Sequence, residues 1–539
     1  MIFTTSGCII RPSKNTLVYF DGHSDRQNDI KCNHNSDNFA GRESAFAVLA
    51  LAQISAITLR EVLVTDLINL MNDLLWGSIL VYLLVGVGIY FTLRLGFIQF
   101  RHFGHMFSVL KNSRKEDNAG ISSFQALCTS LAARVGTGNM AGVAVALTAG
   151  GPGAIFWMWM TACLGMATSF AESTLAQLYK TRDKDGNYRG GPAYYMEKGL
   201  GMRWMGVLFS IFLIIAFGLV FNAVQANSIT NAMNTAFGYE PLYVGIAIVL
   251  LSAFVIFGGI RKIARTAEII VPFMALAYIA IALFVVFMNL EKLPAVFSLV
   301  IKSAFGFQQA AAGGLGYAIA QAMINGVKRG LFSNEAGMGS APNAAASATP
   351  YPPHPASQGY VQMLGVFVDT IVICSATVAI ILMSGEYVPH GEITGIELTQ
   401  RALSSQVGSW GSIFVAFAIF FFAFTSIIAN YSYAETNLIF LEHNNKKGLV
   451  VFRLIFLSMV MFGSLATLPT VWSMADVSMG LMAIVNLVAI LLLSGIVIKL
   501  AKDYNRQLKA GKVPTFDANE YPELKSQLED GIWDNNKKS

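Results

Sequence analysis

Two short clusters of glycine and amide-bearing residues lie inside otherwise apolar stretches of this sequence. The first is Val135–Gly142 (VGTGNMAG) and the second is Phe332–Gly339 (FSNEAGMG). Glycine lets a helix unwind at little steric cost, and the interruption leaves N–H groups free on one side and carbonyls free on the other. Such N–H groups bind a carboxylate and such carbonyls bind a cation. Close helix packing through small residues is the alternative explanation, although Thr137 and Asn139 favour a binding site.

Polar side chains also recur within other apolar stretches. Asn222 and Gln225 are three residues apart and therefore share one face of a predicted helix. Thr425 and Ser426 follow a run of phenylalanines, and Asn430 comes one turn later. Neighbouring hydroxyls suit a hard cation, which prefers oxygen ligands, whereas hydroxyls that bond back to their own helix are the simpler alternative. The amides either line a cavity or bond between helices.

Charged side chains within apolar segments are costly and usually face the protein interior, a partner or a water path. Arg134 and Asp369 lie deep in predicted spans, and Glu335 belongs to the second cluster. We therefore hypothesise a structural or gating ion pair between Arg134 and either Glu335 or Asp369, with unpaired solvation in an inner vestibule as the alternative. Glu172 and Glu435 fall near predicted span ends, where an interfacial role is favoured.

The elements that must position these residues are membrane-spanning helices. The 539 residues are 54% hydrophobic and only 13% charged, a balance with which a water-soluble protein cannot cover its core. A window of about nineteen residues predicts eleven spans, which makes the fold an all-α polytopic membrane protein. They lie near residues 73–97, 121–149, 151–178, 205–231, 242–260, 267–290, 308–331, 360–385, 409–434, 449–469 and 476–499.

Loop charges predict how these spans are oriented. Basic residues gather after the first, third and fifth spans and in the C-terminal tail, and include Arg101, Lys111, Arg114, Lys115, Lys180, Arg203, Arg261, Lys262, Lys499 and Lys502. The opposite loop, 386–400, carries three glutamates. Because basic loops stay in the cytoplasm, we expect the first helix to start outside and the tail to lie inside. This placement also explains the net positive charge without nucleic acid as a partner.

Composition divides the chain into five parts. Residues 1–70 are polar and are predicted to be an extension that is not part of the mature fold, since Met71 opens a segment typical of a membrane-protein start. Residues 71–120 hold one extra span and a basic loop. Residues 121–290 and 291–500 each open on one of the two clusters and are predicted to form inverted repeats. Residues 501–539 are predicted to form a solvated cytoplasmic tail.

Four segments resemble the signature segments of the alanine or glycine:cation symporter family. They are Arg134–Gly142, Gly150–Trp159, Gly190–Tyr195 and Phe332–Pro342. The resemblance implies a sodium or proton symporter of the bacterial inner (plasma) membrane, with the leucine-transporter fold, five-plus-five inverted repeats and one extra N-terminal helix. Its implied partners are a small neutral amino acid such as alanine or glycine, the coupling ion and the lipid bilayer. No cofactor is implied beyond the co-transported ion.

The resemblance also implies roles for individual residues. Val135–Asn139 is similar to the unwound first core helix of the sodium:neurotransmitter symporters, whose N–H groups receive the substrate carboxylate. By this likeness Thr137 and Gly138 contact the carboxylate and Asn139 lies beside it. The implied sodium site comprises Thr425, Ser426 and the carbonyls of Ala132, Val135 and Phe422. The other candidate substrate-binding residues are Gln225, Ser333, Asn334 and Asn430.

One departure from the family affects the expected substrate. Many members have Gly-Trp after the hydroxyl pair, where this chain has Ala429-Asn430. A lost indole makes the cavity larger and more polar, which leaves room for glutamine or asparagine. Sodium coupling is favoured because the hydroxyl pair supplies oxygen ligands, whereas proton coupling would use Asp369 or Glu335.

Two other classes of function are disfavoured by the residues themselves. A passive channel would need a continuous polar pore lining, and the polar residues here form localised clusters instead. An enzyme would need a metal motif or an activated nucleophile. None of the seven histidines lies in a predicted span, so we expect a transporter without catalytic residues.

Overall fold

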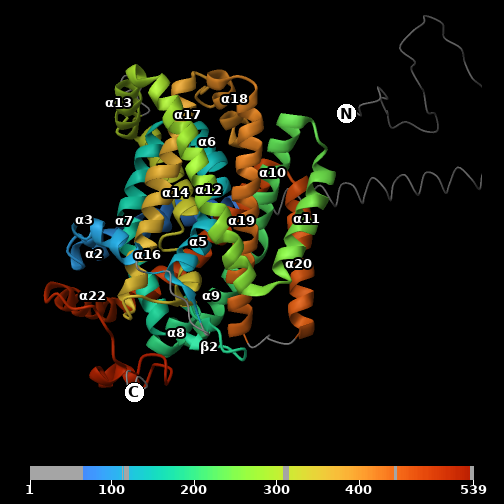
Figure 1. Ribbon diagram of the computed structural model, residues 1–539. Coiled ribbons are helices and arrows are strands. Elements are labelled where there is room, and N and C mark those ends of the chain that lie inside the picture. The colour runs from blue at the N-terminus through green and yellow to red at the C-terminus, as the bar shows by residue number, and fades with distance from the viewer. Residues whose placement is uncertain (1–64, 112, 114–119, 307–314, 442–445, 535–539) are drawn as a thin grey trace, which may run out of the picture. The chain divides into compact units, whose positions relative to one another are not determined.

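The computed structural model describes residues 65–534, apart from residues 112, 114–119, 307–314 and 442–445 (Figure 1). The chain divides into two units, Met1–Asp66 and Leu67–Ser539, and the second holds the elements named below. The predicted extension over residues 1–70 therefore lies almost wholly outside the described residues.

Long apolar helices make up most of the second unit, as its composition predicts. Eight helices among the described residues are long and apolar enough to cross a membrane, and they confirm eight of the predicted spans. They comprise η1 (Leu75–Leu80) with α2 (Val81–Arg94), α7 (Gly153–Leu178), α9 (Arg203–Ile215) with η3 (Ala216–Val220) and α10 (Phe221–Phe237), α12 (Gly259–Met288), α16 (Ala356–Val366) with η6 (Phe367–Cys374) and α17 (Ser375–Ser384), α19 (Trp410–Phe440), α20 (Lys446–Leu465) and α21 (Leu468–Leu492). The other predicted spans fall on the shorter helix α11 (Pro241–Ile256) and on two interrupted helices.

Short elements join the long helices. They are α3 (Ile98–Arg101), α4 (Phe103–Lys111), β2 (Thr181–Arg182), β3 (Tyr188–Arg189), α8 (Pro192–Leu200), η4 (Leu290–Lys292), α13 (Leu293–Ala304), α18 (Gly395–Val407), α22 (Ser494–Lys509), η7 (Ala518–Glu520) and α23 (Pro522–Lys525). Proline stands in the first turn of α8, α11 and α13, where its missing N–H costs no helical hydrogen bond. Elements α8, β2 and α22 lie toward one end of the bundle, and α13 and α18 lie at the other (Figure 1).

The two interrupted helices carry the two glycine clusters. The first comprises α5 (Ser123–Arg134), η2 (Gly138–Gly142) and α6 (Val143–Gly150), and the second comprises α14 (Leu315–Asn334) and α15 (Pro342–Ala346). Strand β1 (Ile121–Ser122) directly precedes the first, and β4 (Ala348–Thr349) directly follows the second. The two strands pair in parallel, so one end of each interrupted helix is joined to the other.

Side chains of α7 and of the turn after it strengthen this strand pair. The Gln177 side-chain amide and the Lys180 ammonium both donate to the Ala348 carbonyl, each at 2.9 Å. At the start of α5, Ser122 and Gln125 form a reciprocal capping box, which satisfies N–H groups that the helix itself leaves free. The β1–β4 pair is therefore held by α7 as well as by its own hydrogen bonds.

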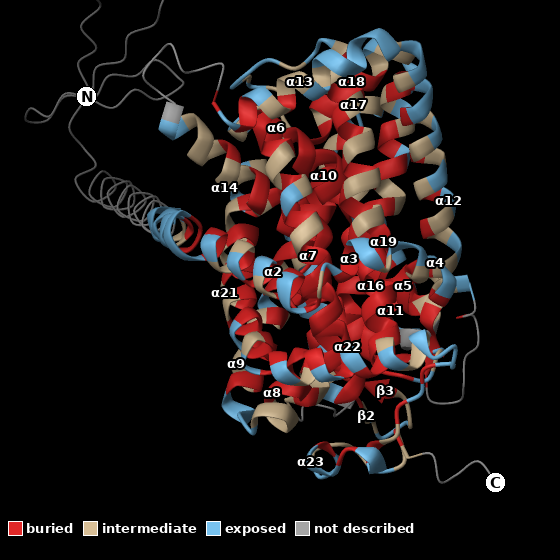
Figure 2. Ribbon diagram, turned by 90° about the vertical axis from the view of Figure 1, so that its left-hand side faces the viewer, coloured by how far each residue is buried: buried red, intermediate tan, exposed pale blue. Residues whose placement is uncertain are grey.

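The outer helices expose apolar side chains, whereas a water-soluble protein buries most of its large apolar side chains. Along α12, Phe273 and Phe287 are 71% and 76% exposed, and Phe254 of α11 is 74% exposed. Buried residues gather instead along the central helices α7, α10 and α16 (Figure 2). An apolar surface of this extent is stable only against lipid. Together with the spans, it makes the chain a multi-pass membrane protein.

The C-terminal region differs from the sequence prediction in two ways. The last span ends at Leu492 and not near residue 499, because the chain turns at Leu493 before the charged face of α22 begins. The tail is also packed instead of solvated. Its Phe516 and Trp533 are buried, the Phe516 N–H donates to the Pro353 carbonyl at 3.0 Å, and the Trp533 indole N–H donates to the Leu178 carbonyl at 3.2 Å. Sparse aromatic residues in a charged tail give too weak a pattern to predict this packing.

A buried ion pair ties α14 to α21. The Arg329 guanidinium donates to the Asp476 carboxylate and lies over the Trp472 ring, 4.2 Å from its centroid. The Lys328 ammonium lies 3.7 Å from the same carboxylate. Two cations therefore share one carboxylate, and the side chains of Arg329 and Asp476 are only 4% and 9% exposed.

Asp476→Asn should strongly destabilise the protein, because it leaves the buried Arg329 without a counter-charge. Removing one partner of a buried pair costs roughly 3–5 kcal/mol, so the thermal unfolding midpoint of the purified protein in detergent should fall clearly. Glu397→Gln is the matched control. It breaks the exposed pair with Arg401, whose side chain is 51% exposed, and should shift the midpoint little. Equal shifts of the unfolding midpoint in the two variants would contradict a stabilising role for the Arg329–Asp476 pair.

Candidate functional site

The first interruption turns its backbone N–H groups away from the helix. Helix α5 ends at Arg134, and Val135 has extended backbone angles. The Gly136 N–H donates to the Asn139 Oδ1 at 2.9 Å. The Thr137 N–H and hydroxyl both donate to the Gln225 Oε1, at 3.0 and 2.8 Å. Consecutive N–H groups therefore point at side-chain oxygens, which is the arrangement that also binds a carboxylate.

Two carbonyls at this interruption lack the donors that a continuous helix would supply. In an α-helix the N–H of residue i donates to the carbonyl of residue i−4, so Gly136 would serve Ala132 and Asn139 would serve Val135. Instead Gly136 donates to a side chain, and the Asn139 N–H donates to the Gly136 carbonyl at 3.3 Å. The Ala132 and Val135 carbonyls are two of the three carbonyls that the family resemblance assigns to a cation, the third being that of Phe422.

The second interruption is a run of left-handed backbone. Glu335, Gly337 and Gly339 all have positive φ, at 58°, 91° and 86°. Glycine adopts this conformation freely, whereas Glu335 is held there by its surroundings. The Ser340 hydroxyl donates to the Glu335 carboxylate at 2.6 Å, and the Asn334 Oδ1 accepts the Ala336 N–H at 3.0 Å. Side chains again replace the helical hydrogen bonds.

The two interruptions lie against each other. A Cβ atom at Gly138 would lie 3.0 Å from the Cα of Ser333, so a larger residue would fit only if the backbone at Ser333 shifted. The Asn139 Nδ2 donates to the Ser333 Oγ at 3.0 Å and to the Asp369 Oδ1 at 2.6 Å. The Ser333 hydroxyl in turn donates to the Asp369 Oδ2 at 2.7 Å. Asp369 of η6 therefore bridges the two clusters.

Asp369 does not pair with Arg134. Its carboxylate accepts from Asn139, Ser333 and the Thr370 hydroxyl. The Arg134 Nη1 instead donates to the Gln362 carbonyl at 3.3 Å. Among the described residues, neither Asp369 nor Glu335 lies within ion-pair distance, 4.0 Å, of Arg134. The hypothesised pair is thus not formed in this structure, because uncharged donors already serve both carboxylates.

The predicted cation ligands on α19 lie beside the first interruption. The Thr425 and Ser426 hydroxyls donate to the Phe422 carbonyl at 2.9 and 3.0 Å, which is the back-bonding expected of hydroxyls in a helix. Yet the Ser426 Oγ lies so near Gly136 that a Cβ there would come within 2.4 Å of it. The hydroxyl oxygens thus keep their lone pairs while their protons point to Phe422.

Asn430 lies apart from the other candidates. Its Nδ2 donates to the Asn222 Oδ1 at 3.1 Å, and the Asn222 Nδ2 donates to the Phe217 carbonyl at 2.6 Å. The structure therefore brings together Thr137, Gly138, Asn139, Gln225 and Ser333. It places Asn430 apart from them, in an amide pair with Asn222 that links α19 to α10. Asn334 belongs to the second interruption, with no partner among the described residues for its Nδ2.

Several residues of the site escaped the sequence analysis. The Thr377 hydroxyl donates to the Asn139 carbonyl at 2.6 Å, and the Tyr278 hydroxyl lies 2.8 Å from Thr377. Phe332 packs between Phe221 and Trp472, with ring centroids 4.7 and 4.6 Å away. In the sequence, each of these residues is a lone hydroxyl-bearing or aromatic residue within an apolar span. Such a residue does not indicate which side chain of another helix it will contact.

The site is closed to solvent in this structure. Thr137, Asn139, Ser333 and Asp369 are all 0% exposed, and Gln225 is 2% exposed. Hydrogen bonding in such a dry environment is stronger than in water. The arrangement can hold a carboxylate and a cation side by side without competition from solvent.

Known proteins resemble this chain over most of its length. Residues 61–518 match the model of a protein family described as "Sodium:alanine symporter family". The "Probable sodium/glutamine symporter GlnT" of Bacillus subtilis is 52% identical, over 84% of this chain and 92% of the relative. The "Sodium/alanine symporter AgcS" of Methanococcus maripaludis is 42% identical, over 82% of this chain and 97% of the relative.

A solved structure supports the fold independently. The crystal structure of MhsT in complex with L-phenylalanine matches with a TM-score of 0.50 at 13% identity, over 72% of this chain and 99% of that one. This likeness shows the fold alone, and it confirms the predicted leucine-transporter-like architecture. The match to the family is long, and its relatives are aligned nearly end to end. The chain therefore belongs to the sodium:alanine symporter family.

Proposed function

We propose that the protein is a secondary transporter that couples uptake of a small neutral amino acid to the movement of sodium. The observation that carries the proposal is the contact between the two interruptions, with a hydroxyl pair beside the first. Each part suits one cargo: the N–H groups suit a carboxylate and the oxygens suit a hard cation. Membership of the family and the names of two relatives agree with this cargo.

The amino acid would displace a side chain of the protein itself. The Gln225 Oε1 accepts from both the N–H and the hydroxyl of Thr137, so it holds donors that a substrate carboxylate needs. Binding exchanges one oxygen acceptor for another and leaves no N–H group unpaired, which keeps its cost low. The substrate ammonium group would lie toward Asp369 and Ser333, because that carboxylate contacts both interruptions.

Sodium would bind between α5 and α19. Its ligands would be the Ala132 and Val135 carbonyls and the hydroxyl oxygens of Thr425 and Ser426. The Phe422 carbonyl would take part by accepting the hydroxyl protons, which turns the oxygen lone pairs toward the ion. Because Ser426 lies against Gly136, the ion and the carboxylate would share one interruption. Binding of one then favours binding of the other.

Three finer points belong to the same proposal. The N-terminal end of the first span would lie outside the inner membrane, and the tail would be cytoplasmic. Residues 121–290 and 291–500 would be inverted repeats that alternate access to the site. The Asn222–Asn430 pair, in which Asn430 stands where many members of the family have an indole, would accept the side chain of a polar substrate such as glutamine in addition to alanine or glycine.

Proteoliposome uptake tests the coupling. With an inward sodium gradient, labelled alanine, glycine or glutamine should accumulate above its external concentration. Thr425→Ala combined with Ser426→Ala should raise the sodium concentration for half-maximal uptake by about tenfold or more, since each lost ion ligand costs on the order of 1 kcal/mol. Equilibration without accumulation would favour a passive pore and contradict the proposal.

The alternative of proton coupling has its own candidate, the buried Asp369. If sodium is the coupling ion, Asp369→Asn should slow uptake but leave it dependent on the sodium gradient. If protons are the coupling ion, uptake driven by a pH gradient should disappear in this variant, whereas weaker binding of the amino acid alone would only slow it. The two results are separated by measuring uptake under each gradient alone.

Gly136→Ala tests whether the first interruption is the binding site. The new methyl group would come within 2.4 Å of the Ser426 Oγ and 2.8 Å of the Gln225 Oε1. Overpacking of this kind costs about 1–3 kcal/mol, so uptake should fall roughly tenfold or more while the amount of folded protein stays similar. Gly86→Ala is the control, because no atom lies within 4 Å of its Cβ position. Normal uptake by Gly136→Ala would refute the assignment.

A further inference from the structure

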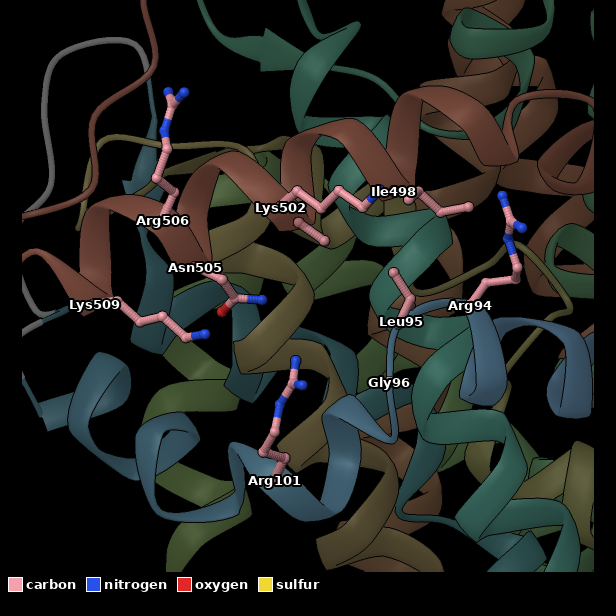
Figure 3. Close-up of a pocket in the computed structure, with 10 residues that line it drawn as sticks. Arg94, Leu95, Gly96, Arg101, Ile498, Lys502, Asn505, Arg506 and Lys509 are labelled. Carbon is pink, nitrogen blue, oxygen red and sulfur yellow. The ribbon is translucent and has the colours of Figure 1, made fainter.

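A second site of different chemistry lies outside the transport machinery, between the end of α2 and helix α22. It is a pocket of about 550 Å³. Its lining residues are Arg94, Leu95, Gly96, Arg101, Ile498, Ala501, Lys502, Asn505, Arg506 and Lys509. Five of these ten side chains are cationic and none is acidic. Figure 3 shows Arg101 and Lys509 reaching toward Asn505 from separate elements.

Within the part of the chain that the structure describes, most of these cations lack a carboxylate partner. Arg506 pairs with Asp503. Among the described residues, no carboxylate lies within 4.0 Å of the side-chain nitrogens of Arg94, Arg101, Lys502 or Lys509. Like charges around one pocket repel each other, so the free energy of this arrangement improves when an anion binds there.

The charge of the cluster is felt by its neighbours. Burial, and then the charges of Arg101, His105 and Lys509, lower the pKa of His102 below its usual value. A neutral His102 adds no further positive charge at neutral pH. The anion would therefore be held by the arginines and lysines and not by histidine.

The surroundings of the pocket place it at the surface of the bilayer. Leu95 and Ile498 form part of its wall. On α3, α4 and the turn before them, Phe97, Phe100 and Phe107 are 51%, 60% and 46% exposed. Exposed aromatic residues beside arginine and lysine are typical of the membrane interface. A ligand with an anionic head and an apolar tail matches both features, whereas a free anion matches only the first.

We propose that this pocket binds the phosphate group of an anionic phospholipid, with its acyl chains running along the exposed phenylalanines. Basic pockets between helices at the cytoplasmic face are the usual binding sites of such headgroups. Arginine can hold two phosphate oxygens at once, and Arg94 and Arg101 come from opposite sides of the turn at Gly96.

The pocket is connected to the scaffold of the transport site. The Tyr360 hydroxyl of α16 donates to the Asn505 Oδ1 at 3.1 Å, and the Tyr504 hydroxyl lies 3.0 Å from the His105 Nε2. Helix α16 continues into η6, which carries Asp369. Lipid bound here would therefore hold α22 and α3 against the rest of the bundle, and its effect should appear as greater thermal stability of the whole protein.

Lipid titration of the purified full-length protein in detergent tests the proposal. Phosphatidylglycerol should raise the thermal unfolding midpoint in a saturable way, and phosphatidylcholine should not. Native mass spectrometry should show a retained phosphatidylglycerol molecule. The affinity of the double variant Arg101→Gln with Lys509→Gln for phosphatidylglycerol should be lower by about tenfold or more, since each cation near the lipid adds on the order of a fewfold in affinity.

Two controls separate a specific site from charge in general. Lys184→Gln with Lys512→Gln removes two exposed lysines outside the pocket and should keep the lipid effect. Arg101→Lys with Lys509→Arg keeps the charge and should also retain binding, which guards against misfolding as the cause of a loss. Equal binding of the two lipids by the natural protein would overturn the proposal, as would full binding by the Gln double variant.

Inorganic phosphate distinguishes the two sources of the anion. If phosphate alone stabilises the protein through Arg101 and Lys509 while phosphatidylglycerol does not, the pocket is a site for a soluble anion and the lipid proposal is wrong. If phosphate acts only as a weak competitor of the lipid, the acyl chains contribute to binding as proposed. Neither result depends on which amino acid is transported.

Discussion

The structure depends on how backbone hydrogen bonds are satisfied away from water. In a bilayer an unpaired peptide group costs several kcal/mol, so a helix can be interrupted only where other groups replace its lost bonds. Here Asn139, Gln225 and Asn334 supply those replacements. The polar residues of the site therefore complete the fold, and under the proposed function they have a second task, which is to yield their hydrogen-bond partners to a ligand.

This double task explains the dense hydrogen bonding around Asp369. The carboxylate is buried without a cation within bonding distance and is held by an amide and two hydroxyls. Asn139 comes from the first interruption and Ser333 from the second, whereas Thr370 is the neighbour of Asp369 on η6, so the carboxylate fixes where the two interruptions meet. The Arg329–Asp476 pair does the same for α14 and α21 with full charges, at a place where no cargo has to pass.

Much of the fold could be predicted from the sequence because the bilayer imposes it. Apolar length alone located the long spans, and glycines among amides located both interruptions. Thr137, Asn139 and Gln225 were found because polar residues are rare in such segments. The Thr377–Asn139 contact and the Asn222–Asn430 pair were not, since which helices become neighbours depends on packing between distant parts of the chain. The packed tail escaped for a related reason: Trp533 gains its partner Leu178 from a helix 355 residues away.

The parallel pair of β1 and β4 has a mechanical consequence. It joins Ile121, just before the first interrupted helix, to Ala348, just after the second, and Gln177 of α7 and Lys180 of the turn after it hold the Ala348 carbonyl. Neither helix end can swing outward alone without breaking this small ladder. A motion that separates the two helix ends therefore has to break the ladder, whereas a motion that carries both ends together leaves it intact.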